Sequence, residues 1–156
     1  MNSTAKLYLE RANNKIILAK MNFEVSAKPE LKKTLGIPIE QTFYNDVISQ
    51  SYYAIFYAAK AFLTGKGIET SPPEEHKKTY EHFKKMVESG DLNQELLEIY
   101  ESEREKAEEL LKIFYIEKKK RGRFTYNVNA NANIPYAEES IKNAIKFTTA
   151  IKSIMQ

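Results

Sequence analysis

The sequence predicts an all-α protein, a single domain over residues 1–156 built as a five-helix up-and-down antiparallel bundle. Three observations support this prediction. The chain has only five glycines and five prolines to interrupt helices. No stretch keeps up the apolar–polar alternation of a strand. The run from Phe43 to Leu63 contains only two charges, Asp46 and Lys60, although 29% of the chain is charged. A helix that is apolar almost all round is usually buried.

The first helix is predicted from a capping residue and from the breakers that follow it. Ser3 is the expected N-cap, and the helix is expected to run to Met21 or Phe23. The segment 24–38 is predicted to be a loop because it contains three breakers, Pro29, Gly36 and Pro38.

The second helix contains the low-charge run and is expected near the centre of the bundle. It is predicted from about Ile39 to Gly65, where a glycine supplies a C-terminal stop. Ser71 is the expected cap of the third helix, over residues 73–89, because two prolines follow it and proline is tolerated in a first turn. This helix is expected to end at Gly90.

The last two helices are separated by an asparagine-rich segment. Asn93 is predicted to cap the fourth helix, which runs into a basic tract near Lys120. Residues 121–134 read as an irregular loop, and the fifth helix is expected from Pro135 to about Ile154.

The central helix carries one polar seam whose members are spaced 4, 3, 4, 3 and 4 residues apart, which is the helical repeat. The seam consists of Asp46, Gln50, Tyr53, Tyr57, Lys60 and Thr64. Two interpretations stay open. The seam is either an exposed edge that can pack against a second copy, or a ligand-lining cleft formed by its first five members.

Charge is unevenly placed along the fourth predicted helix. Residues 94–111 hold seven acids and two bases, whereas residues 112–123 hold six bases and one acid. The basic end either complements its own helix dipole or forms a phosphate-binding patch. Candidates for phosphate or nucleotide binding are Lys119, Lys120, Arg121 and Arg123, followed by the aromatic pair Phe124 and Tyr126.

Several classes of chemistry have no support in the sequence. The chain has no cysteine, which excludes disulfides and thiolate catalysis. Its two histidines, His76 and His82, are six apart and are expected to be ordinary surface or capping residues, so no metal site is predicted. No phosphate loop, zinc-protease motif or nucleophile elbow is present, and no cofactor is expected. We also expect a cytoplasmic protein without a membrane span.

The run Ser51-Tyr52-Tyr53-Ala54-Ile55-Phe56-Tyr57-Ala58-Ala59-Lys60-Ala61-Phe62-Leu63 resembles the signature helix of the HEPN domain family, the higher eukaryote and prokaryote nucleotide-binding domain. Further segments continue the resemblance, and together they span residues 40–154, as in small archaeal and bacterial toxin-like members. They are Gly67-Ile68-Glu69-Thr70, His76, Arg121-x4-Tyr126, Ala137-Glu138-Glu139-Ser140 and Ala144-Ile145-Lys146-Phe147.

The resemblance implies a helical bundle, often a homodimer, and in many members a minimal nucleotidyltransferase as antitoxin partner. Active toxins of this family are metal-independent endoribonucleases with an Arg-x4–6-His motif. Here Tyr126 stands where the histidine would follow Arg121, and a phenol that titrates near 10 is a poor base at neutral pH.

Three hypotheses follow from the residues and the resemblance. The first is a protein that binds nucleotide or RNA phosphate through Arg121, Arg123 and the neighbouring lysines. The second is an endoribonuclease with Arg121 and Tyr126 as catalytic candidates. The third is a structural dimerisation module without catalytic activity.

Overall fold

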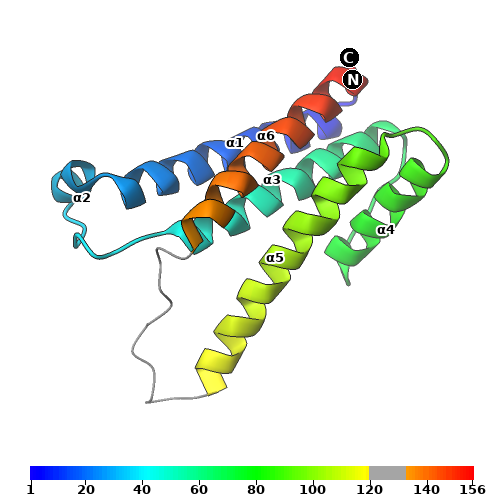
Figure 1. The fold of residues 1–156 in the computed structure, drawn as a ribbon. Helices are drawn as coiled ribbons and strands as arrows, with labels where there is room; N and C mark the ends of the chain where they lie inside the picture. The colour runs from blue at the N-terminus through cyan, green and yellow to red at the C-terminus, as the bar shows by residue number, and fades with distance from the viewer. Residues whose placement is uncertain (120–132) are drawn as a thin grey trace.

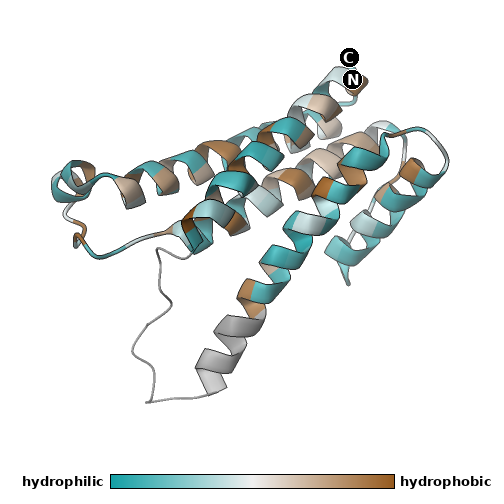
Figure 2. Ribbon diagram, in the orientation of Figure 1, coloured by the Kyte–Doolittle hydropathy of each residue, from teal (hydrophilic) through white to brown (hydrophobic). Residues whose placement is uncertain are grey.

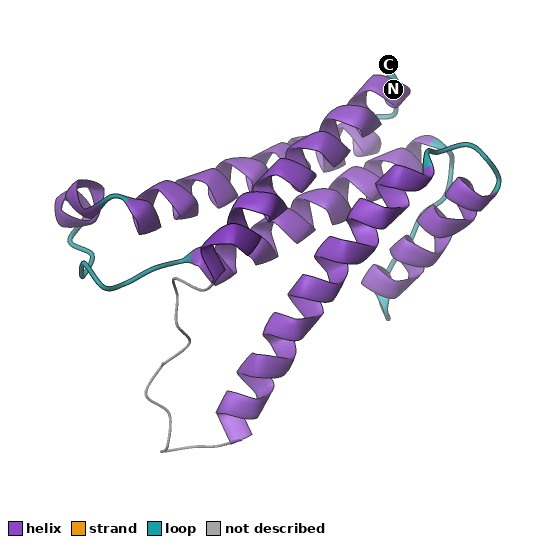
Figure 3. Cartoon of the chain, viewed as in Figure 1, coloured by secondary structure: helices purple, strands orange, loops and turns teal. Residues whose placement is uncertain are grey.

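The computed structural model describes residues 1–119 and 133–156, with the backbone alone described for residues 112–119. Over these residues the chain is all helical and contains no strand (Figure 3). The fold class predicted from the sequence is therefore confirmed, with six helices in the described residues where five were predicted. They are α1 (Ser3–Ala27), α2 (Pro29–Leu35), α3 (Tyr44–Gly65), α4 (Glu75–Glu88), α5 (Gln94–Lys119) and α6 (Ile134–Met155).

Helix α3 is the centre of the bundle. It packs against α1, α6, α5 and α4, so nearly every side of it is covered by another helix. Alanines at positions 54, 58 and 61 are fully buried, and their small side chains let neighbouring helices approach closely. The low charge of this segment in the sequence has its physical cause here, because an unpaired charge on any covered side would lose its hydration.

The helices around α3 differ in how closely they follow it. In Figure 1, α1 and α3 run antiparallel, α6 lies beside both, and the two chain termini are close together. Helix α5 diverges from this layer toward its C-terminal end, and α4 packs against α3 and α5. In the hydropathy colouring of Figure 2, most of α4 is teal, and α5 carries both teal and brown segments along its coloured length.

The segment 24–38 is mostly helical, and its prediction as a loop is wrong. Helix α1 continues to Ala27, and Pro29 occupies the first turn of the short helix α2. Proline is tolerated there because the first backbone N–H groups of a helix have no intrahelical acceptor. Gly36 ends α2 in the left-handed conformation, with φ of 69°. The breakers therefore mark the two ends of a helix and leave its interior intact.

Helix α3 begins at Tyr44, later than the predicted Ile39. The preceding segment is held by side chains of α1 and α2. Ser26 Oγ accepts a hydrogen bond from the backbone N–H of Phe43 at 2.7 Å, and Lys32 Nζ donates to the carbonyl of Ile39 at 2.7 Å. These tertiary bonds satisfy backbone groups outside a helix, which the sequence pattern alone does not reveal.

The predicted caps have mixed outcomes. Asn93 caps α5 as predicted, since its Oδ1 accepts from the N–H of Glu95 at 2.9 Å. The cap of α1 is Asn2 and not Ser3, because Asn2 Oδ1 accepts from the N–H of Thr4 at 2.8 Å. Helix α4 begins at Glu75, so both prolines precede it and Ser71 is not its cap.

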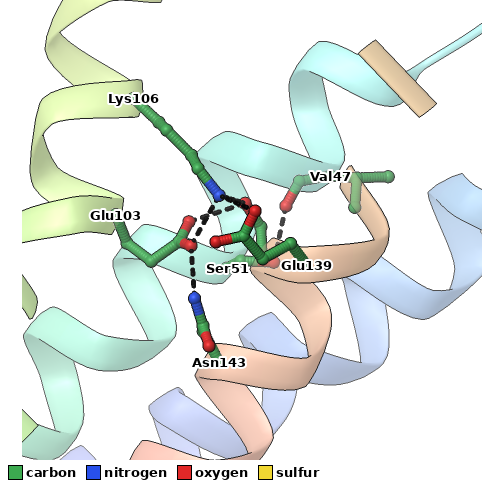
Figure 4. A network of polar contacts seen from close by, with 7 residues as sticks. Val47, Ser51, Glu103, Lys106, Glu139 and Asn143 are labelled. Atoms are coloured by element: carbon green, nitrogen blue, oxygen red, sulfur yellow. Dashed lines mark hydrogen bonds and ion pairs between the residues drawn. The ribbon is translucent and has the colours of Figure 1, made fainter. Parts of the chain in front are cut away.

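A buried carboxylate ties α5 to α6 (Figure 4). Glu103 has no solvent exposure. It accepts hydrogen bonds from Ser140 Oγ at 2.6 Å and Asn143 Nδ2 at 3.0 Å, both on α6. Lys106, one turn further along α5, donates to it at 2.9 Å and also lies 3.5 Å from the carboxylate of Glu139. Every oxygen of the buried charge therefore has a partner, which is the condition for a stable buried ion pair.

Removing this carboxylate is expected to destabilise the bundle. Glu103→Ala leaves Lys106 and Ser140 without their buried acceptor, and we expect a loss of about 3 kcal/mol in the free energy of unfolding. Urea unfolding followed by circular dichroism measures the effect. Glu105→Ala removes an exposed carboxylate from the same helix and should change stability by less than about 0.5 kcal/mol. Equal effects of the two substitutions would contradict the role of Glu103.

Two negative findings apply to the described part of the chain. None of its helices is long and apolar enough to cross a membrane. The described side chains, those of residues 1–111 and 133–156, also contain no group of three histidine, aspartate or glutamate residues placed to hold a metal ion.

Candidate functional site

Aromatic and basic side chains gather on one surface formed by α1, α3 and the first turn of α4. On α1 the contributing residues are three and four positions apart, so they share one face of the helix. On α3 they are four apart and face α1. The aromatic–basic surface consists of Tyr8, Arg11, Lys15, Tyr53, Tyr57 and His76.

The first part of this surface is a stacked pair of tyrosines with an arginine beside it. The rings of Tyr8 and Tyr57 have centroids 6.2 Å apart and planes inclined by 16°. The guanidinium carbon of Arg11 is 5.7 Å from each ring centroid. Arg11 is exposed, so its fork of N–H donors remains accessible to an anion while the rings hold it near the surface.

The second part pairs a lysine with an exposed tyrosine. Lys15 Nζ lies 5.5 Å from the ring centroid of Tyr53. Tyr53 is 38% exposed, an unusually large fraction for an aromatic residue of the central helix. An ammonium beside an accessible ring can bind a phosphate while the ring stacks with a planar group.

His76 forms the edge of the surface on the α4 side. Its ring stacks on Phe56 with centroids 3.9 Å apart and planes inclined by 12°. Its Nδ1 lies 2.9 Å from the hydroxyl of Tyr52, and its ring meets Tyr53 edge-on at 5.8 Å. The prediction of an ordinary surface or capping histidine did not foresee these contacts, which place the imidazole between three aromatic rings of α3.

The environment keeps this histidine neutral near pH 7. Burial lowers the pKa of His76, the positive charges of Lys60 and Arg104 lower it further, and the carboxylate of Glu75 opposes them. Burial also raises the pKa of Tyr52 to about 12, with Arg104 acting in the opposite direction. The phenol is therefore protonated at neutral pH.

Below the surface, Lys60 joins α3 to α4. It is 4% exposed, forms an ion pair with Glu75, and donates to the backbone carbonyl of Thr70 at 3.0 Å. Its Nζ also lies 4.7 Å from the ring centroid of Tyr8. Burial opposes the charge, but hydrogen bonds to Glu75 and Tyr8 outweigh it and raise the pKa of Lys60. The ion pair positions the start of α4, and with it His76.

The predicted polar seam is divided between surface and interior. Asp46 is exposed at the start of α3, and Gln50 is half-buried with an Oε1 that has no partner among the described residues. Tyr53 and Tyr57 lie on the aromatic–basic surface, whereas Lys60 lies beneath it. The structure thus brings Tyr53, Tyr57 and Lys60 together, and the lining of a ligand cleft by the first five members of the seam remains a prediction.

The predicted phosphate site falls outside the described residues. Lys120, Arg121, Arg123 and Tyr126 belong to the segment 120–132, which the structure does not describe. Lys119 is the last residue of α5, and its side chain is likewise not described. Their proposed roles remain predictions from the sequence.

Sequence reasoning missed Tyr8, Arg11 and Lys15 as members of a site. The available signal was their 3- and 4-residue spacing on α1, but such spacing occurs on many solvated helix faces. Only the packing of α1 on α3 places these side chains beside Tyr53 and Tyr57.

A comparison with known families agrees with this fold. A sequence model of the HEPN domain matches residues 33–154 of the chain. The chain belongs to the HEPN domain family. A comparison with curated proteins finds no match. The matched range of this HEPN protein begins inside α2, so α1 and its share of the aromatic–basic surface precede it.

The neutral state of His76 predicts how stability depends on pH. The pKa of His76 is lower in the folded protein than its ordinary value of 6.5, so the unfolded chain binds more protons below about pH 6.5. The contribution of this residue is fully present above that pH and is lost as the pH falls through the folded-state pKa. We therefore expect the melting temperature of wild type to fall more steeply between pH 7.5 and pH 5 than that of His76→Phe.

Thermal unfolding over this pH range is the measurement, and His82→Phe is the matched control. The phenylalanine at position 76 retains an aromatic ring against Phe56 but cannot be protonated. Parallel pH profiles for wild type and His76→Phe would contradict the prediction. A profile of His82→Phe that follows wild type assigns the effect to position 76.

Proposed function

We propose that this HEPN protein binds single-stranded RNA or nucleotide phosphate at the aromatic–basic surface. The observation that carries the proposal is the pairing of accessible cations with aromatic rings, Arg11 with Tyr57 and Lys15 with Tyr53. Family membership supports a function related to nucleotides or RNA in general.

The two pairs suit the two chemical parts of a nucleotide. Arg11 and Lys15 are one turn apart on α1 and supply positive charge for successive phosphates. The exposed ring of Tyr53 supplies a stacking platform, and base–aromatic stacking is worth about 1–3 kcal/mol per base. This combination tolerates many sequences, because every base has a π-face.

Other parts of the proposal come from the family resemblance and the sequence. Phosphate binding by Lys119, Lys120, Arg121 and Arg123 is retained as a prediction, and so is a homodimer. Three further predictions are retained. They are a minimal nucleotidyltransferase as antitoxin partner, a cytoplasmic location, and an endoribonuclease activity through Arg121 and Tyr126.

Binding of a fluorescein-labelled 15-nucleotide single-stranded RNA tests the proposal by fluorescence anisotropy. Arg11→Ala/Lys15→Ala is expected to weaken binding about tenfold at 0.1 M salt, because two phosphate contacts are lost. The slope of log K against log salt should become shallower by about 1.4 for the same reason. Tyr53→Ala should weaken binding by about 1–3 kcal/mol with little change in that slope.

The matched control is Lys28→Ala/Lys33→Ala, which removes two exposed positive charges near the other end of α1. This variant should keep near-wild-type affinity. An equal loss in both double variants would show that net charge alone drives binding and would overturn the proposed site. Arg121→Ala/Arg123→Ala, measured in the same series, reports separately on the phosphate site predicted from the sequence.

A further inference from the structure

His76 presents one ring nitrogen to the protein and leaves the other available. The hydroxyl of Tyr52 occupies Nδ1 at 2.9 Å. Among the described residues Nε2 has no hydrogen-bond partner, and His76 is only half-buried. The available nitrogen belongs to a ring that lies against Tyr53, the exposed aromatic residue of the surface.

The hydrogen bond with Tyr52 decides which nitrogen carries the proton. Tyr52 is buried, and among the described residues its hydroxyl has no other hydrogen-bond partner. A buried O–H group needs an acceptor, so the phenol donates to Nδ1 and the ring proton of the neutral imidazole resides on Nε2. Nε2 is then a donor and cannot accept.

The ring is also held in orientation. Phe56 stacks on one face, and the Tyr52 bond prevents the imidazole from rotating about its own axis. The fixed N–H of His76 lies beside an exposed aromatic ring on which a planar ligand can stack. It can therefore favour a ligand that presents an acceptor to it over one that presents a donor.

We infer that His76 Nε2–H donates a hydrogen bond to a carbonyl oxygen of an RNA base stacked on Tyr53, so that the surface prefers bases with an oxo group at position 4 of a pyrimidine or position 6 of a purine. Uracil presents a 4-oxo group where cytosine presents a 4-amino group, and guanine and adenine differ in the same way at position 6. An amino group at this place would leave two donors facing each other. The inference rests on the proposed RNA-binding function and adds a specificity-determining residue to it, with Tyr52 as the positioning residue.

The test compares the affinities of oligouridylate and oligocytidylate 15-mers at pH 7.5 by anisotropy. Wild type should prefer oligouridylate roughly threefold to tenfold, the value of one net hydrogen bond. His76→Gln should bind both with little preference, because its amide can turn to donate or accept. Tyr52→Phe should also lose the preference while retaining most of the affinity, because the released imidazole can exchange the proton between its nitrogens.

Tyr80→Phe is the matched control for the loss of a hydroxyl. The hydroxyl of Tyr80 donates to Glu101, and the hydrogen bond to His76 comes from Tyr52, so removing the Tyr80 hydroxyl should leave the preference unchanged. Thermal unfolding of each variant at pH 7.5 confirms that the folded state is being compared. Long-range ¹H–¹⁵N spectra provide a readout that needs no RNA: His76 should be the Nε2–H tautomer in wild type and a mixture in Tyr52→Phe.

The outcomes separate this inference from the proposed function. If wild type binds neither oligonucleotide, both are overturned. If it binds both and the preference is absent, or is unchanged in His76→Gln, only the role of His76 is overturned. An Nδ1–H tautomer in wild type also overturns it. A preference that is lost in His76→Gln and Tyr52→Phe but kept in Tyr80→Phe supports it.

Discussion

The burial of α3 is the constraint on which the rest of the structure depends. Four helices pack around it, and each polar group on its covered sides therefore needs a partner from a neighbouring helix. Lys60 pairs with the carboxylate of Glu75 and donates to the carbonyl of Thr70, and Tyr52 is hydrogen-bonded to the imidazole of His76. These partners determine where α4 starts relative to α3. The candidate site is a consequence of the same requirement.

A second buried charge has a comparable role between α5 and α6. Glu103 on α5 is satisfied by two α6 side chains and by Lys106. Apolar packing alone allows helices to slide with little change in buried area, whereas hydrogen bonds to a buried carboxylate demand one register. The orientation of α5 and α6 around the central helix thus depends on a few polar atoms beside a cluster of aliphatic and aromatic side chains.

The aromatic–basic surface arises where the covering of α3 is incomplete. Between α1 and the first turn of α4, Tyr53 remains partly exposed, and the cations of α1 lie against Tyr53 and Tyr57. A ring in this position stabilises a nearby cation and remains available to a planar ligand. The same arrangement holds His76 in one orientation. A binding surface and a structural contact are therefore built from the same side chains.

The sequence by itself determined the helical class, the central position of α3, the Asn93 cap and the resemblance to the HEPN family, because these depend on local composition and periodicity. It did not reveal that Pro29 begins a helix, since a proline is equally consistent with a loop and with a first turn. Nor did it reveal the histidine at the site. Only the tertiary structure decided that His76 meets Tyr52 and that α1 contributes Arg11 and Lys15, because contacts between residues distant in the chain depend on which helix faces pack together.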